Sequence, residues 1–124
     1  MIADDQQPEV WVGHIAMDTD QLEGSVSFML ALGMRSIFKT ADIAILELRA
    51  ATHLVLVRKD HVEPGEASFD LMVDDLDATH GRLTEAGVSP SAIEEGRIHN
   101  RFSVRDPSGH TITINSSHAS GLTV

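Results

Sequence analysis

The chain has 124 residues, 42% of them hydrophobic, which fits one globular domain with a modest core. Nine Lys and Arg residues against nineteen Asp and Glu residues give a net charge of −10, and this charge argues against nucleic acid and anionic lipid surfaces as partners. The chain has no cysteine, no signal-peptide pattern and no apolar run long enough for a membrane span, so we expect a cytoplasmic protein without disulfides or a membrane partner.

The first predicted elements are a strand and a helix. Apolar residues alternate at Ile15 and Met17 in the segment that begins at His14, as in a half-buried strand. A helix is expected near residues 20–32, ended by Gly33 as a left-handed stop. Its apolar residues at helical spacing are Leu22, Val26, Met29 and Leu30.

Three short β runs and a linker follow this helix. The runs are expected at residues 35–40, 43–48 and 52–57. The linker is expected at residues 61–67, because it contains the turn-forming pair Pro64-Gly65.

The next part of the chain repeats the first. His14 and Ser68, Leu22 and Leu76, and Gly33 and Gly87 are each separated by the same 54 positions. Phe69, Leu71 and Val73 alternate as a second strand, and a second helix is expected near residues 75–86. One offset that fits strand start, helix start and helix end indicates a true internal repeat.

The remaining β runs are expected near residues 92–94, 101–105 and 110–115. Asp106-Pro107-Ser108-Gly109 has the residues that a type I turn prefers, and it joins the last two runs as a hairpin. Each half is therefore predicted to be βαβββ, over about residues 10–60 and 66–115. We expect the polar tails, 1–8 and 116–124, to be loosely held.

Four local motifs point to a known family. They are Gly13-His-Ile-Ala-Met17, Val73-Asp-Asp-Leu-Asp-Ala78, Leu83-Thr-Glu-Ala-Gly87, and the hairpin from Phe102 to Ile112. Together with the repeat, they resemble the vicinal oxygen chelate superfamily of glyoxalases, bleomycin resistance proteins and extradiol dioxygenases, over roughly residues 10–115. The resemblance implies a single α+β domain in which two βαβββ halves form a curled mixed sheet, a cup with the helices outside.

Strand alternation predicts which side chains line this cup. They are His14, Ala16, Asp18, His53, Val55, Ser68, Asp70, Met72, Thr111, Thr113 and Asn115. Glu47 joins them if residues 49–51 form a three-residue hairpin turn, and it faces the other side if the turn has two residues.

The resemblance also implies four metal-ligand positions, which in this chain hold His14, Val55, Ser68 and Thr113. Valine has no donor atom, and a neutral hydroxyl is a poor replacement for imidazole or carboxylate. We therefore expect no metal at this position and no other cofactor. The alternative is a displaced divalent metal site formed by His14, His53 and Asp70.

Three functions remain open. The first is a protein that binds a small organic molecule, partly cationic or hydrogen-bonding, through the cup residues. The second is a lyase, isomerase or dioxygenase-type enzyme that uses the displaced metal set, or His14 and Asp70 as acid and base. The third is a structural or regulatory dimer with a vestigial cup. Family members of this size commonly form two-fold dimers, so we expect a homodimer, in which the cup lies within one chain or is shared by two.

Overall fold

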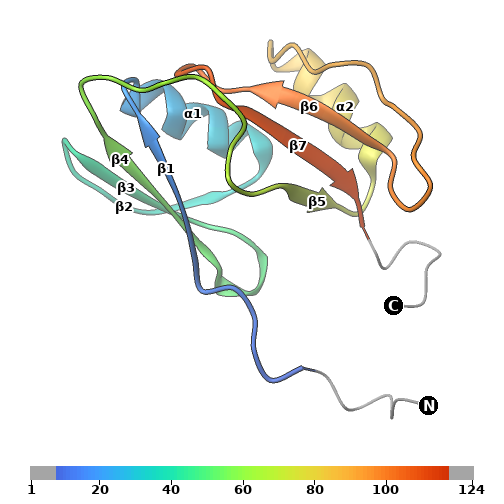
Figure 1. The fold of residues 1–124 in the computed structure, drawn as a ribbon, viewed down its shortest axis with the longest axis horizontal. Coiled ribbons are helices and arrows are strands. Elements are labelled where there is room, and N and C mark those ends of the chain that lie inside the picture. Colours follow the sequence, from blue (N-terminus) through green and yellow to red (C-terminus); the bar gives the residue numbers. More distant parts are fainter. Residues whose placement is uncertain (1–7, 118–124) are drawn as a thin grey trace.

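The structure is a computed structural model that describes residues 8–117 (Figure 1). The first half contains β1 (His14–Thr19), α1 (Leu22–Leu32), β2 (Arg35–Lys39), β3 (Ile43–Glu47), the short 3-10 turn η1 (Arg49–Ala51) and β4 (His53–Arg58). The second half contains β5 (Leu71–Val73), α2 (Leu76–Glu85), β6 (Arg101–Arg105) and β7 (Thr111–Ser116). Neither helix has the length and hydrophobicity needed to cross a bilayer within these residues.

Each half forms its own mixed sheet. The N-terminal sheet has the strand order β1-β4-β3-β2, and the C-terminal sheet has the order β5-β7-β6. In both sheets the first strand of the half runs parallel to the last one, β1 beside β4 and β5 beside β7. The repeated topology confirms the predicted α+β fold and the repeat on which it rests.

The predicted run near residues 92–94 is not a full strand. Its pairing with β6 is reduced to one bridge, between Glu94 and Arg101, and to the hydrogen bond from Ser91 N to Ser103 O. Pro90 has no N–H to donate to a strand ladder, and the chain turns sharply before β6, where a Cβ on Gly96 would lie 2.4 Å from the carbonyl oxygen of His99. The second half is therefore βαββ with a remnant of the missing strand.

The tails differ in part from expectation. Ser116 is the last residue of β7, and its N–H donates to the carbonyl oxygen of Asn100. The expectation of loosely held tails at residues 1–7 and 118–124 lies outside the described residues.

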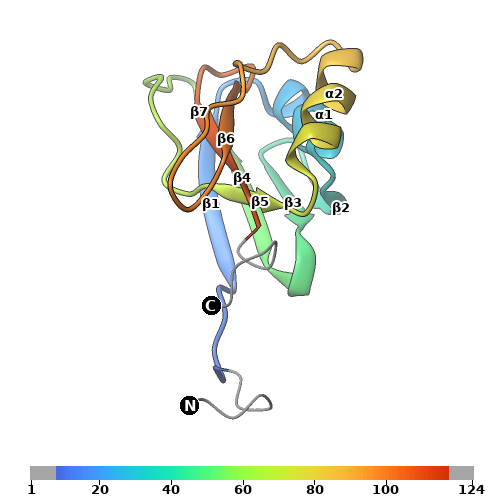
Figure 2. The same ribbon diagram turned by 90° about the vertical axis from the view of Figure 1, so that its right-hand side faces the viewer.

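The helices pack against the sheet faces that point away from the predicted cup residues. Leu54 and Ile112, predicted to face the helices, are fully buried, and Ile15 and Leu71 pack against the same core from its margin. One continuous core joins both halves, and Figure 2 shows both helices on one side of the sheets. The two halves of a chain thus meet through their helix-bearing faces.

A buried polar network fixes the contact between the halves. The Asp106 carboxylate accepts a hydrogen bond from Ser25 Oγ in α1 at 2.7 Å, and Ser25 Oγ lies 2.7 Å from Thr19 Oγ1 at the end of β1. Thr19 and Ser25 are fully buried, and Asp106 is 2% exposed. Because a buried polar group without a partner is costly, this network favours one relative placement of the halves.

The β3–β4 hairpin contains backbone strain. Ala50 and Ala51 have φ angles of 60° and 64°, in the left-handed region that costs an L-residue roughly 1–2 kcal/mol. We expect Ala50→Gly and Ala51→Gly each to raise the free energy of unfolding by up to about 1 kcal/mol, because the relief exceeds the added entropy of the unfolded chain. Urea titration measures this. The matched control is Ala78→Gly in α2, which should lower stability by about 1 kcal/mol, and a loss in all three variants would contradict the strain.

Candidate functional site

The outward face of the N-terminal sheet carries a row of polar side chains. Arg35, Glu47, His53 and His14 lie opposite one another on the adjacent strands β2, β3, β4 and β1. The rings of His14 and His53 meet edge to face with their centroids 5.7 Å apart, and the Arg35 guanidinium donates to the Glu47 carboxylate. We call these four residues the polar row.

The polar row settles the orientation of Glu47. The N–H of Leu48 donates to the carbonyl oxygen of Thr52 at 2.8 Å, so the hairpin loop has three residues. Glu47 then pairs directly with His53 and shares its face. It therefore belongs with the predicted cup residues.

At the next outward-facing position of each strand, the same face becomes apolar. Ala16, Val55, Ile45 and Phe38 lie opposite one another across the four strands, and we call them the apolar row. The side chain of Phe38 is 52% exposed although it is aromatic. The N-terminal sheet thus presents a surface with a polar end and a hydrocarbon centre.

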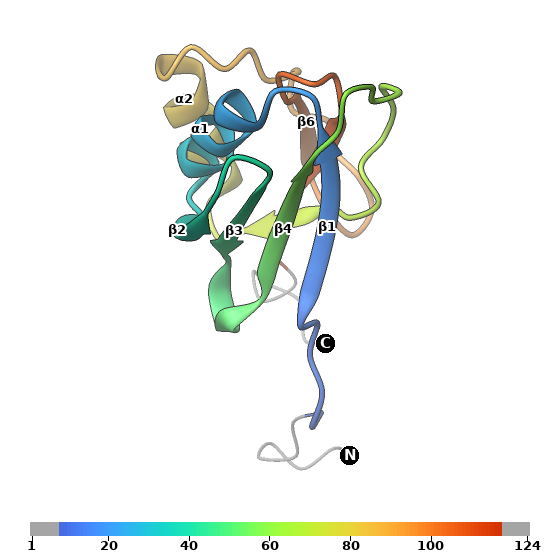
Figure 3. The same ribbon diagram turned by 90° about the vertical axis from the view of Figure 1, so that its left-hand side faces the viewer.

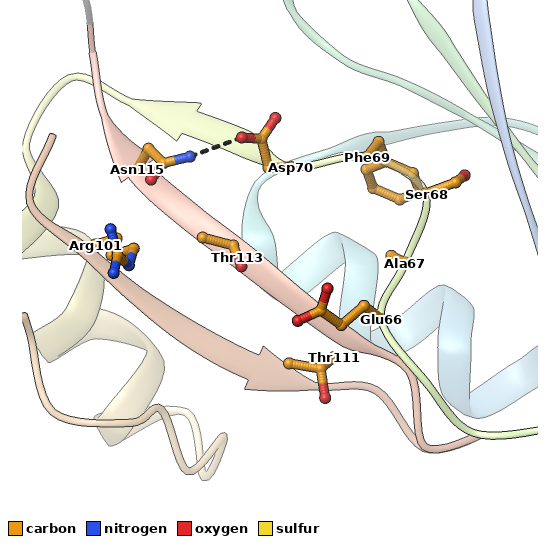
Figure 4. Close-up of a pocket in the computed structure, with 9 residues that line it drawn as sticks. All are labelled: Glu66, Ala67, Ser68, Phe69, Asp70, Arg101, Thr111, Thr113 and Asn115. Atoms are coloured by element: carbon orange, nitrogen blue, oxygen red, sulfur yellow. Dashed lines mark hydrogen bonds between the residues drawn. The ribbon is translucent and has the colours of Figure 1, made fainter. Parts of the chain in front are cut away.

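The second half presents a polar pocket of about 490 Å³ (Figure 4). It is lined by Glu66, Ala67, Ser68, Phe69, Asp70, Arg101, Thr111, Thr113 and Asn115. Five of these were predicted from the sequence. The Asn115 amide donates to the Asp70 carboxylate at 2.8 Å and is itself buried, so it holds that carboxylate in place.

Four lining residues of this pocket were not predicted. Arg101 pairs directly with Asn115 across β6 and β7, so strand register in the last hairpin would have identified it. Glu66 enters through a single parallel bridge to Thr111, from a linker without a strand pattern. Ala67 is the last residue of this linker. Phe69 follows the linker, and its alternation with Leu71 and Val73 predicts that it faces the core and not the pocket.

The remaining predicted residues lie at the margins. Asp18 is exposed at the end of β1, and its carbonyl oxygen lies 2.8 Å from Nε2 of His110. Met72 is 51% exposed and borders a different groove, between the two halves, rather than the pocket.

The two faces do not meet within one chain. The pocket has no lining residue from the first half, and Figure 3 looks directly onto the N-terminal sheet with the C-terminal sheet behind it. His14 and His53 are adjacent, whereas Asp70 lies on the other half. Accordingly, residues 8–117 of a single chain contain no cluster of three His, Asp or Glu side chains suited to a metal ion.

The four implied ligand positions do not fit the metal that the resemblance suggests. Val55 lies between Ala16 and Ile45 in the apolar row, so hydrocarbon surrounds the place of a carboxylate. Ser68 and Thr113 bring only neutral hydroxyls to the pocket. A divalent ion favours anionic oxygen or imidazole ligands, and His14 alone supplies one.

Comparison with known proteins gives a family and a fold. The model of the glyoxalase/bleomycin resistance protein/dioxygenase superfamily matches residues 11–114. None of the curated protein sequences compared with the chain matches it.

Several solved structures share the fold. A lactoylglutathione lyase from Agrobacterium tumefaciens has a TM-score of 0.74 and 16% identity, over 90% of this chain and 96% of that one. A bleomycin-binding protein from bleomycin-producing Streptomyces verticillus, in complex with copper(II)-bleomycin, has a TM-score of 0.67 and 20% identity, over 90% and 99%. The oxidase ChaP-H2 has a TM-score of 0.69 and 18% identity, over 92% and 99%. At these identities the likeness concerns the fold alone.

Proposed function

Because the chain belongs to the glyoxalase/bleomycin resistance protein/dioxygenase superfamily, we propose that it binds a small organic molecule in a cup completed by a second copy of the chain, without the family metal. The observation that carries this proposal is the apolar row, which occupies the place of a metal ligand with a hydrocarbon surface. Binding sites for small molecules are mostly apolar with a few placed polar groups, and the two rows together have that composition.

The ligand chemistry follows from the two faces. An aromatic or alicyclic body lies on Val55, Ile45 and Phe38, and hydrogen-bonding groups contact His14 and His53 in the polar row. From the second copy, the pocket contributes the Asp70 carboxylate and the Thr113 hydroxyl. Asp70 and Glu66 favour a partly cationic ligand, in keeping with the net charge of −10.

The homodimer is supported by exposed apolar area. Phe38 and Ile43 on the outward face are 52% and 38% exposed, and Trp11, which precedes β1, is 68% exposed. Large apolar side chains that remain exposed on a small protein are candidates for an interaction surface. A second copy would cover this face and bring its pocket opposite the polar row.

The enzymatic alternative has less support. Acid and base catalysis needs His14 and Asp70 at one substrate, and the displaced metal site needs the same pair together with His53. Within one chain these residues lie on separate faces, so this chemistry needs the same second copy as the shared cup. In residues 8–117 of one chain, the ring of His14 contacts the ring of His53 and no carboxylate is hydrogen-bonded to it.

A fragment screen tests the binding proposal. Aromatic and alicyclic amines, with metal-free bleomycin as a further probe, are titrated into methyl-labelled protein. We expect saturable shifts of the Val55 and Ile45 methyl groups, lost in Val55→Asp. Binding that leaves these methyl groups unperturbed, or a screen in which no compound binds, would contradict the proposal.

Subunit mixing tests whether the cup is shared. Light scattering at micromolar concentration should give twice the mass of one chain. His14→Ala and Asp70→Ala should each weaken a hit from the screen by about tenfold, the loss of one or two polar contacts. Mixing the two variants should restore one of the two cups in each heterodimer. In an equimolar mixture that exchanges freely, half of the dimers are heterodimers, so about a quarter of the wild-type number of sites should return. A monomer, or a mixture without recovered sites, would show that the cup is not shared.

A further inference from the structure

A separate groove of about 740 Å³ opens between the two halves, beside β5 and the C-terminal end of α1. Its wall is formed mainly by strand residues that alternate with the cup residues and therefore point to the other face of the sheet. Ile15, Phe69, Leu71 and Val73 line it and pack against the margin of the core. The groove is therefore an apolar recess that is separate from the polar row and adjoins the pocket on the C-terminal sheet, with which it shares Phe69 and Asp70.

The rim of this groove is acidic. Asp70, Asp74 and Asp75 line it, and Arg49 is the one basic side chain among the lining residues within the described part of the chain. Asp70 accepts a hydrogen bond from Asn115, and Asp75 accepts one from the N–H of Ala78. A carboxylate has about four lone-pair sites, so both keep acceptor capacity towards the groove.

The position of Arg49 shows where a positive charge is held. Its guanidinium donates to both carboxylate oxygens of Asp74, at 2.8 and 3.3 Å, and so bridges the two halves across the rim. These hydrogen bonds and the guanidinium charge lower the pKa of Asp74. The two side chains are 79% and 66% exposed, and an ion pair this exposed is weak enough for another cation to replace it.

We propose that the groove binds an amphiphilic cation, with its apolar part against Ile15, Leu71 and Ile114 and its ammonium group at Asp74 in place of the Arg49 guanidinium. Apolar walls alone would accept a fatty acid equally well. The three carboxylates at the rim select the cation, because they leave the rim negative even while Arg49 pairs with Asp74.

The direct test is to titrate alkylamines of increasing length into the whole chain and to observe its methyl groups by NMR. Hexylamine, octylamine and decylamine should shift the methyl groups of Ile15, Leu71 and Ile114 and leave those of Ile45 and Val55 unchanged. Affinity should rise about threefold to fourfold for each added methylene group. Decanoate should bind at least about tenfold more weakly than decylamine, because like charges repel at the rim. Equal binding of decanoate would overturn the proposal without bearing on the cup. Shifts confined to Ile45 and Val55 would also overturn it and would place the amine in the cup instead.

Two surface ion pairs of the same kind provide a matched control. Asp74→Asn should weaken decylamine about tenfold, whereas Arg49→Ala should strengthen it by removing the competing cation. Asp42, in the β2–β3 turn, forms an exposed pair with Arg58 at the end of β4, and Asp42→Asn should leave the affinity unchanged. Equal effects of Asp74→Asn and Asp42→Asn would show that net charge, and not the groove, attracts the amine.

Methyl NMR without added amine tests whether the groove is instead filled by a second copy of the chain or by the chain's own C-terminal segment. If the Ile15 and Leu71 methyl shifts change with protein concentration while those of Ile45 and Val55, on the face that the proposed dimer covers, stay constant, a second copy fills the groove. If they change when the chain is ended after Ser117, the chain's own C-terminal segment fills it. Either result would overturn the proposal, and shifts insensitive to both changes would support it.

Discussion

Replacing Asp106 by alanine is expected to lower the free energy of unfolding by about 3–5 kcal/mol, the summed cost of leaving several buried donors without an acceptor. The Asp106 carboxylate accepts from Ser25 Oγ, from the N–H and Oγ of Ser108, and from the N–H of His110. Ser25 gives its single hydroxyl proton to Asp106, so the Thr19 hydroxyl donates to Ser25. The truncation therefore leaves buried donors without an acceptor in both halves, and urea unfolding with full linear extrapolation measures the loss.

Two control variants identify the cause of the loss. Asp106→Asn keeps the size of the side chain but lacks the second acceptor oxygen, so it should recover only part of the stability. Asp42→Ala removes an exposed carboxylate and should change stability by less than about 0.5 kcal/mol. A cost below about 1 kcal/mol for Asp106→Ala would mean that the network does not hold the halves together.

Restoring the missing ligands should create a metal site. In the triple variant Val55→Glu, Ser68→His and Thr113→Glu, His14 is joined by two carboxylates and a second imidazole at the positions that the family resemblance implies. We expect its affinity for Ni²⁺ or Zn²⁺ to exceed that of the wild type by at least about a thousandfold, because each ligand adds coordination energy. Calorimetric titration after purification without added metal or chelator compares the two proteins.

The design separates ligand chemistry from cup assembly. His14→Ala in the triple variant should abolish the gain, and Val55→Glu alone should bind metal no better than the wild type. If the triple variant dimerises but binds no metal, the residue-by-residue correspondence to the ligand positions is wrong. Stoichiometric, His14-dependent metal in the wild type would instead contradict the metal-free proposal, and its loss in Asp70→Ala would favour the displaced set.

Local sequence patterns were sufficient to predict most of the fold. Strand alternation and helical spacing can be recognised from residues that are close in the sequence. The common offset of 54 positions indicates that the same pattern of strand and helix occurs twice. The stops at Gly33 and Gly87 were also predictable, since their φ angles of 116° and 87° suit glycine. The strand predicted near residues 92–94 forms only one bridge, because the run is short and backbone restrictions at Pro90 and Gly96 outweigh its apolar pattern.

The site was harder to predict because it depends on how strands pair. Parity placed His14, His53 and Val55 on one face, but only the register shows that His14 and His53 are direct neighbours and that Val55 lies in a hydrocarbon row. The contact between Ser25 and Asp106 spans 81 positions and leaves no periodic signal. The placement of Asp70 away from His14 follows from how the halves pack, which strand patterns do not encode.

The apolar row has a consequence for how this protein can change over evolutionary time. In the proposed closed cup, a single mutation to Glu at Val55 places a carboxylate between Ala16 and Ile45, where it costs desolvation energy before any metal can compensate for it. A first mutation at Ser68 or Thr113 gains nothing either, because too few ligands are present to hold an ion. Under the metal-free proposal, a return to metal chemistry therefore requires several substitutions that are favourable only in combination, so the metal-free state behaves as a ratchet.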